Sequence, residues 1–127
     1  MRYASHVSWW VEYFEDETGH ESVQGEIGGF PKKAQAKILR FIDLLQAEGP
    51  INLGAGYVRH IEDDIWELRV DSGHDRYRVL YFIITDRTIV LLRAFLKKTQ
   101  RTPRGEIRTA QRRMEKVKEA HERGEGR

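Results

Sequence analysis

Four strand-like segments follow one another in the middle of the chain, and the connections between them are very short. They occupy residues 57–61, 65–70, 76–84 and 88–96. Polar turn residues separate them, and no connection is longer than five residues. A parallel crossover needs about a dozen residues or more, so these segments are predicted to pair as an antiparallel meander.

The last two of these segments are expected to lie in the centre of the sheet. Segment 76–84 is apolar on both of its alternations, with Val79, Tyr81 and Ile83 on one side and Leu80, Phe82 and Ile84 on the other. Such strands are covered on both faces. One cover is a helix predicted at 31–48, because Pro31 suits the first helical position and Gly49-Pro50 ends the helical pattern.

The two ends of the chain add a strand and two helices. Alternating apolar residues predict a strand at 7–14, and Ser22 is a candidate N-cap for a short helical turn. Thr102 can cap a helix that begins at Pro103 and carries an apolar stripe of Ile107, Ala110, Met114 and Val117. Residues 118–127 are expected to fray. We therefore expect one α+β domain over 1–127, an antiparallel sheet packed by N-terminal helices with a basic C-terminal helix.

Apolar runs and charge narrow the classes of function. The longest apolar run, 79–84, has six residues, whereas a membrane-spanning helix needs about 20. The start of the chain lacks a signal-peptide pattern and cysteine is absent, so we expect a cytoplasmic protein with no membrane partner.

Charge is distributed unevenly along the chain. Residues 1–30 hold one basic and six acidic residues, whereas 97–118 hold nine basic and two acidic. This segregation favours a C-terminal region that faces a polyanion, with a solvated helix surface as the alternative.

Several kinds of chemistry find no support in the sequence. The five histidines never fall four residues apart, as a helical pair of metal ligands would. Gly54-Ala55-Gly56 follows no predicted strand and lacks the third glycine of a dinucleotide-binding fingerprint. The chain has neither a cysteine nor a G-x-S-x-G motif for covalent acyl transfer. We therefore expect neither a metal nor a cofactor.

A cluster of charged residues remains as the candidate site. Strand alternation and antiparallel pairing are expected to gather charged side chains from three strands, namely Glu67, Arg69, Arg76, Arg78, Lys97 and Lys98. Such a cluster suits a phosphate group if the arginines lie at the rim of the sheet. The alternative is a set of cross-strand ion pairs, such as Glu67 with Arg78, which needs no ligand.

Three motifs occur in order through this region. W-E-L-R spans 66–69, Y-R-V-L-Y-F spans 77–82, and F-x-K-K-T-x-x-T-P-x-x-E-I spans 95–107. With this combination the chain resembles, over about residues 7–118, the HigB-like, phage Gp49-related branch of the RelE/ParE toxin superfamily. The resemblance implies a small RelE-like fold and the toxin of a type II toxin-antitoxin pair. Such a toxin is typically a ribosome-dependent mRNA endonuclease, held in a hetero-oligomer by a helix-turn-helix antitoxin of the Xre or HigA type.

The resemblance also implies roles for four residues of the cluster. Metal-independent cleavage by attack of the 2′-hydroxyl needs a base, an acid and cations for the developing phosphate charge. Arg78 matches the arginine of the family's Y-R-L-V-Y-like strand, and Lys98 matches a cationic position after the last strand. Glu67 and Arg69 stand where ribosome-dependent members carry lysines, so Glu67 is the candidate base. As a rim residue, Arg78 is expected to tolerate Arg78→Ala without unfolding.

Further residues are candidates around that catalytic group. His60 and His74 are alternative acid or base groups, and six basic side chains are candidate RNA contacts: Lys97, Arg76, Arg101, Arg104, Arg112 and Arg113. The last two can instead hold an acidic antitoxin segment or line a solvated helix surface. Two other functions stay open, a ParE-like inhibitor of DNA gyrase and a catalytically silent regulator that binds antitoxin.

Overall fold

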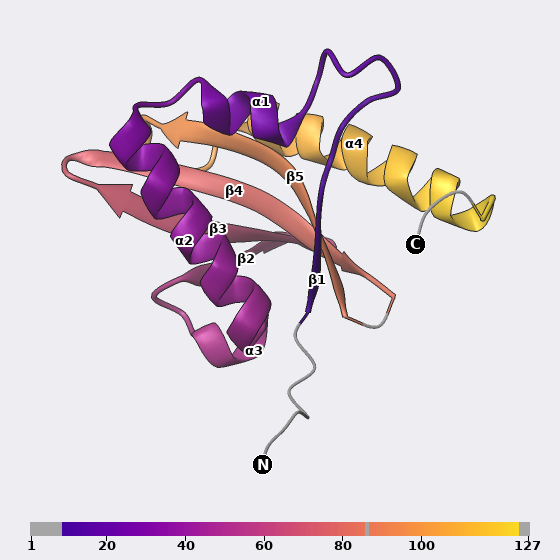
Figure 1. Ribbon diagram of the computed structural model, residues 1–127, viewed down its shortest axis with the longest axis horizontal. Coiled ribbons are helices and arrows are strands. Elements are labelled where there is room, and N and C mark those ends of the chain that lie inside the picture. The colour runs from indigo at the N-terminus through magenta and orange to yellow at the C-terminus, as the bar shows by residue number, and fades with distance from the viewer. Residues whose placement is uncertain (1–8, 86, 125–127) are drawn as a thin grey trace.

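A five-stranded sheet with helices on both faces forms the protein in a computed structural model that describes residues 9–85 and 87–124 (Figure 1). Its elements in chain order are β1 (Trp10–Tyr13), α1 (Val23–Gly28), α2 (Lys32–Glu48), α3 (Pro50–Leu53), β2 (Val58–Glu62), β3 (Ile65–Ser72), β4 (Asp75–Ile84), β5 (Thr88–Lys97) and α4 (Arg104–Glu122). The strands lie in the order β1-β5-β4-β3-β2. The α+β class and the antiparallel meander of β2 to β5 are confirmed.

The first strand departs from the expected antiparallel sheet. β1 pairs in parallel with β5 at the edge of the sheet, where Tyr13 lies opposite Leu91. Parallel pairing of β1 with β5 is possible because most of the chain separates the two strands. This length is more than the crossover between two parallel strands requires. The strand is also shorter than the predicted 7–14, of which residues 7 and 8 lie outside the described residues.

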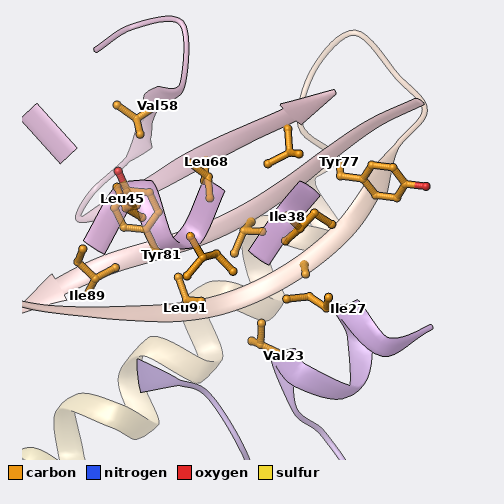
Figure 2. Packing of buried hydrophobic residues seen from close by; sticks show 14 of the residues in the cluster. Val23, Ile27, Ile38, Leu45, Val58, Leu68, Tyr77, Tyr81, Ile89 and Leu91 are labelled. Carbon is orange, nitrogen blue, oxygen red and sulfur yellow. The ribbon is translucent and has the colours of Figure 1, made fainter. Parts of the chain in front are cut away.

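The two central strands are covered on both faces, as their sequences predict. On one face, Ile38 and Leu45 of α2 lie in one buried cluster with Leu68, Tyr81 and Leu91 of the sheet (Figure 2). On the other face, Ala110 and Met114 of α4 complete a second buried cluster with Ile65, Leu80, Phe82, Val90, Leu92 and Phe95. The C-terminal helix therefore covers the face that α2 leaves open.

A glycine separates α2 from α3. Gly49 has a φ of 82°, and a Cβ at this position would lie 2.5 Å from Nε1 of Trp9. Only glycine fits both the backbone conformation and the close indole ring. The predicted end of α2 is confirmed, but Pro50 begins α3 where the sequence predicts a loop, because proline also suits a first helical turn. Pro31, predicted as the first helical residue, lies one position before α2.

The start of α4 also differs from the prediction. The sequence predicts that Thr102 caps this helix, but Pro103 occupies the N-cap position, and no side-chain hydrogen bond in the described chain caps the helix. The apolar stripe is confirmed, with Ile107, Ala110 and Met114 buried against the sheet. The hydroxyl of Thr102 therefore has another role.

The C-terminal end of α4 is longer than expected. Fraying from residue 118 is wrong as far as Glu122, because the helix continues to that residue. Lys118 lies 3.2 Å from Asp64 in an ion pair that joins this part of α4 to the turn between β2 and β3. Residues 125–127 of the expected tail lie outside the described residues. Within the described chain, no helix has both the length and the apolar character needed to cross a membrane.

Candidate active site

The charged cluster lies at the end of the sheet where β4 begins and β5 ends. The strand register places Arg76 opposite Lys97 on β5 and places Arg78 opposite Arg69 on β3. Residues directly opposite each other in an antiparallel pair point to the same face. The three strands therefore converge on this place as their alternation predicts, beside the connection from β5 to α4.

Glu67 and Arg78 form a buried ion pair within the cluster. The side chain of Glu67 is 0% exposed and that of Arg78 is 2% exposed, with Nε of the arginine 3.7 Å from Oε1 of the glutamate. Nη1 of Arg78 lies 3.0 Å from Oδ1 of Asp71 and donates to the carbonyl of Tyr77 at 2.8 Å. Arg78 is therefore not at the rim, and the cross-strand ion pair that the sequence left as the alternative is present.

Thr102 completes the surroundings of Glu67. Its hydroxyl donates a hydrogen bond of 2.6 Å to Oε2 of the glutamate, and both side chains are buried. The sequence predicts a helix-capping role for this threonine and not this contact with Glu67. The only signal available was its place in the T-P pair just after the last strand, which capping explained equally well.

Lys97 is the second buried cation of the cluster. Its side chain is 4% exposed. Burial lowers the pKa of the Lys97 ammonium, the charge of Glu67 opposes that shift, and Arg78, Arg59 and Arg76 lower the pKa further. Arg59 was not among the predicted site residues, although it lies directly opposite Glu67 on β2 and therefore points to the same face.

The remaining predicted cations lie around this buried centre. Nη2 of Arg76 donates to the carbonyl of Thr99 at 3.4 Å, which ties β4 to the connection after β5. Arg69 is half-buried on β3, while Lys98 and Arg101 are exposed in that connection. A polyanion that approaches this end of the sheet therefore meets an exposed basic rim before it reaches the buried pair.

The two histidines predicted as alternative acid or base groups lie elsewhere. His60 is opposite Trp66, on the face of the sheet away from Glu67, and its ring centroid lies 5.1 Å from that indole ring. Its Nε2 lies 2.7 Å from the carbonyl oxygen of Asp63. His74 is exposed in the turn between β3 and β4. Neither histidine contacts the carboxylate of Glu67 in the described structure.

Three arginines predicted to contact RNA form ion pairs away from the cluster. Arg104 lies 2.6 Å from Glu62, and Arg112 lies 3.4 Å from Glu21. Arg113 is buried, 2.8 Å from Oε2 of Glu26. The acidic N-terminal region and the basic C-terminal region, which are far apart in sequence, thus neutralise each other in part.

The cluster combines the groups that metal-independent phosphoryl transfer requires. Glu67 has a carboxylate oxygen, Oε1, that is buried from solvent and has no hydrogen-bond partner among the described residues. Arg78 and Lys97 supply buried positive charge, which acts more strongly in a site that excludes water. Among residues 9–85 and 87–124, no group of three or more acidic, histidine or cysteine side chains is placed to hold a metal ion.

One protein family and two sequence relatives match most of this chain. The family described as "Phage derived protein Gp49-like" matches residues 25–115, a range that contains β2 to β5 and the whole charged cluster. Two relatives named "Probable endoribonuclease HigB1", from the CDC 1551 / Oshkosh and H37Rv strains of Mycobacterium tuberculosis, are each 34% identical to the chain over 92 residues. These residues make up 72% of this chain and 70% of each relative.

Proposed function

Because the chain belongs to the phage-derived Gp49-like family, we propose that it is the toxin of a toxin-antitoxin pair and an endoribonuclease that cleaves mRNA. The name of the two mycobacterial relatives supports the ribonuclease activity. The observation that carries the proposal is Glu67, a carboxylate buried beside two buried cations, Arg78 and Lys97. A buried base next to stabilisers of negative charge suits attack by a ribose hydroxyl better than it suits a passive binding surface.

In the proposed reaction the 2′-hydroxyl of the substrate attacks the adjacent phosphate. RNA binding must first uncover Glu67, which is 0% exposed. Oε1 of the glutamate then accepts the proton of that hydroxyl, and Arg78 stabilises the charge that develops on the phosphate oxygens. The ammonium of Lys97, whose pKa is lowered mainly by burial, gives its proton to the departing 5′-oxygen. The products are a 2′,3′-cyclic phosphate and a 5′-hydroxyl. The role of base therefore falls to Glu67 rather than to His60 or His74.

The rim of the cluster is proposed to hold the RNA on either side of the cleaved bond. Positive charge here comes from five side chains: Arg59, Arg69, Arg76, Lys98 and Arg101. Contacts of this kind bind phosphates and fix the strand without reading its sequence. Arg104, Arg112 and Arg113 are not assigned to this role, because they form ion pairs with Glu62, Glu21 and Glu26 away from the cluster.

The proposed partners and location follow from the family. We propose that the enzyme acts in the cytoplasm on mRNA bound to the ribosome. A helix-turn-helix antitoxin would hold it inactive in a hetero-oligomer. An adjacent reading frame for such a protein, and its copurification with this chain, would test the partner. Expression of the chain without that partner should arrest growth.

An RNA-cleavage assay tests the function directly. Purified protein is incubated with mRNA, with and without ribosomes, in a buffer whose Mg²⁺ keeps the ribosomes assembled. We expect cleavage that requires ribosomes and that a 2′-deoxy nucleotide at the cleaved position abolishes. Glu67→Gln should slow cleavage by about 100-fold or more if the glutamate is the base. Asp43→Asn is the matched charge control, since Asp43 is exposed on α2, which covers the opposite face of the sheet.

Three results would contradict parts of the proposal. Intact mRNA after incubation of folded protein with translating ribosomes would exclude the ribonuclease function. Trapped DNA breaks in the presence of gyrase would then support the ParE-like alternative. Cleavage of RNA that carries the 2′-deoxy substitution would retain the nuclease activity but exclude attack by the 2′-hydroxyl.

A further inference from the structure

The strand β1 lies at the edge of the sheet and turns part of its backbone outward. The amides of Trp10 and Phe14 both donate to carbonyls on the β5 side, and backbone groups alternate in direction along a strand. The N–H and C=O groups of Val11 and Tyr13 therefore point away from the sheet. No strand in the described part of the chain pairs with this outer edge. Such an edge is a template for another extended segment.

A hollow of about 430 Å³ opens beside this edge, between the chain that leaves β1 and the last turns of α4 (Figure 1). Three half-buried apolar side chains line it, Ile84 from β4 and Val117 and Ala120 from α4. The buried side chains of Phe14 and Val90 complete its apolar wall. Because the first three keep part of their surface exposed, an apolar side chain that enters the hollow can contact them.

The lip of the hollow is acidic. Two basic side chains line it, Lys116 and Arg123, together with His121. They are outnumbered by five carboxylates, namely Glu12, Glu15, Asp16, Glu17 and Glu119. Charge complementarity therefore favours a basic partner at this surface and disfavours RNA.

We propose that an extended segment of the antitoxin pairs with the outer edge of β1, places apolar side chains in the hollow and places basic side chains on its acidic lip. This inference rests on the proposed function, which supplies the antitoxin as the partner. Strand addition gains affinity from main-chain hydrogen bonds and specificity from alternate side chains. Every second side chain of the added strand points to the face that α4 covers, which is the face of Val90 and of the hollow.

This docking surface lies at the other end of β5 from the charged cluster. β1 pairs with residues 88–91, whereas Lys97 is the last residue of the strand. At about 3.3 Å per residue, Leu91 and Lys97 are about 20 Å apart along β5. Variants of the hollow are therefore expected to cleave RNA as the wild type does.

Amide hydrogen exchange tests the strand pairing. The probe is the helix-turn-helix protein of the adjacent reading frame, coexpressed and copurified with this chain. In the free chain the amide of Glu12, which faces β5, should exchange more slowly than those of Val11 and Tyr13. In the complex the amides of Val11 and Tyr13 should also become slow. If both still exchange as in the free chain, the proposed pairing is wrong.

A proline in β1 tests the same pairing through affinity. Val11→Pro removes an outward N–H and leaves the hydrogen bonds to β5 in place, and proline is tolerated on edge strands in this position. Val11→Ala is the control for the lost side chain. We expect the Kd for the antitoxin to be about 10-fold higher for Val11→Pro than for Val11→Ala, because an acceptor on the partner loses its donor.

Two further pairs of variants test the hollow and its lip. Ala120→Trp fills the hollow and should raise Kd on the order of 30-fold or more, as the loss of a central contact does. Ala47→Trp, at an exposed position on α2, is the matched control. Glu119→Lys should slow association on the order of 10-fold at low salt and less at high salt, whereas Glu48→Lys on α2 should not. The melting temperature of each variant shows whether it is folded.

The readouts separate failure of this inference from failure of the proposed function. Folded Ala120→Trp and Val11→Pro that bind the antitoxin as tightly as their controls would overturn the docking surface and leave the toxin function standing. If the wild type binds no such protein, the proposed partner fails and the inference fails with it, while RNA cleavage by the free chain is tested independently. An antitoxin segment that protects β1 but carries acidic side chains would overturn the role of the lip. Should Val11→Pro fail to fold, Ala120→Trp and the amide exchange of the wild type decide.

Discussion

The buried pair of Glu67 and Arg78 sets a measurable part of the free energy of unfolding. Arg78→Met keeps much of the side-chain volume and removes the counter-charge of a carboxylate that is 0% exposed. Removing one partner of a buried pair costs about 3–5 kcal/mol, because the other charge is left without compensation. Asp71 adds little to this figure, since its side chain is 66% exposed and exposed pairs contribute about 0–1 kcal/mol.

Thermal melts and urea unfolding measure this cost. One kcal/mol shifts the melting temperature of a chain of this size by about 4 °C, so Arg78→Met should melt about 12–20 °C below the wild type. Adding Glu67→Gln to Arg78→Met removes the uncompensated charge and should restore a large part of the lost stability. Arg40→Met replaces an exposed arginine of α2 and serves as the control, with an expected change within about 0.5 kcal/mol.

Two outcomes would refute this reasoning. A melting temperature of Arg78→Met within about 2 °C of the wild type would show that Arg78 behaves as a rim residue, as the sequence alone predicts. An equal loss in Arg78→Met and in the double variant would show that the cost does not come from the charge of Glu67.

Four further predictions concern single residues. Tyr81→Phe should leave the free energy of unfolding in urea unchanged or raise it by up to about 1 kcal/mol, because the buried Tyr81 hydroxyl, whose pKa is raised by burial, has no partner among the described residues. Gly49→Ala should lower that free energy by about 1–3 kcal/mol, while Gly56→Ala, with open space around it, should not. Lys97→Met should stabilise the protein at neutral pH, and the gain should shrink as pH rises toward the ordinary lysine pKa of 10.5, because burial lowers the pKa of Lys97. Glu67→Gln should lower that pKa further, as measured by NMR titration of the Lys97 side chain.

Local patterns were sufficient for the meander and for the main helix. The period of two in residues 57–96 and the helical spacing that ends at Gly49 depend on neighbours in sequence, so they are visible in the sequence itself. The parallel pairing of β1 with β5 joins segments that most of the chain separates, and an alternating pattern is the same for either strand direction. Its direction could not be predicted from that pattern.

The candidate site was predictable in its position but not in its burial. Alternation placed Glu67, Arg78 and Lys97 at one end of the sheet. The contacts of Arg78 with Asp71 and of Glu67 with Thr102 are not encoded by any periodic pattern. The basic C-terminal helix illustrates the same limit. Charge counted along the sequence indicates a polyanion-binding surface on this helix. In the folded protein, however, Arg113 forms an ion pair with Glu26, which is far away in sequence.

The parallel pair of β1 and β5 has a consequence for the order of events during translation. Among the described strands, β1 is the first to leave the ribosome, and its neighbour in the sheet, β5, is the last one made. The nascent chain therefore carries an unpaired first strand until its partners in β5, residues 88–91, have been synthesised, and pairing between such distant segments is slow. Thr102 is made later still, just before the final helix. A newly made chain thus completes both its sheet and its charged cluster only as the last quarter of the protein emerges.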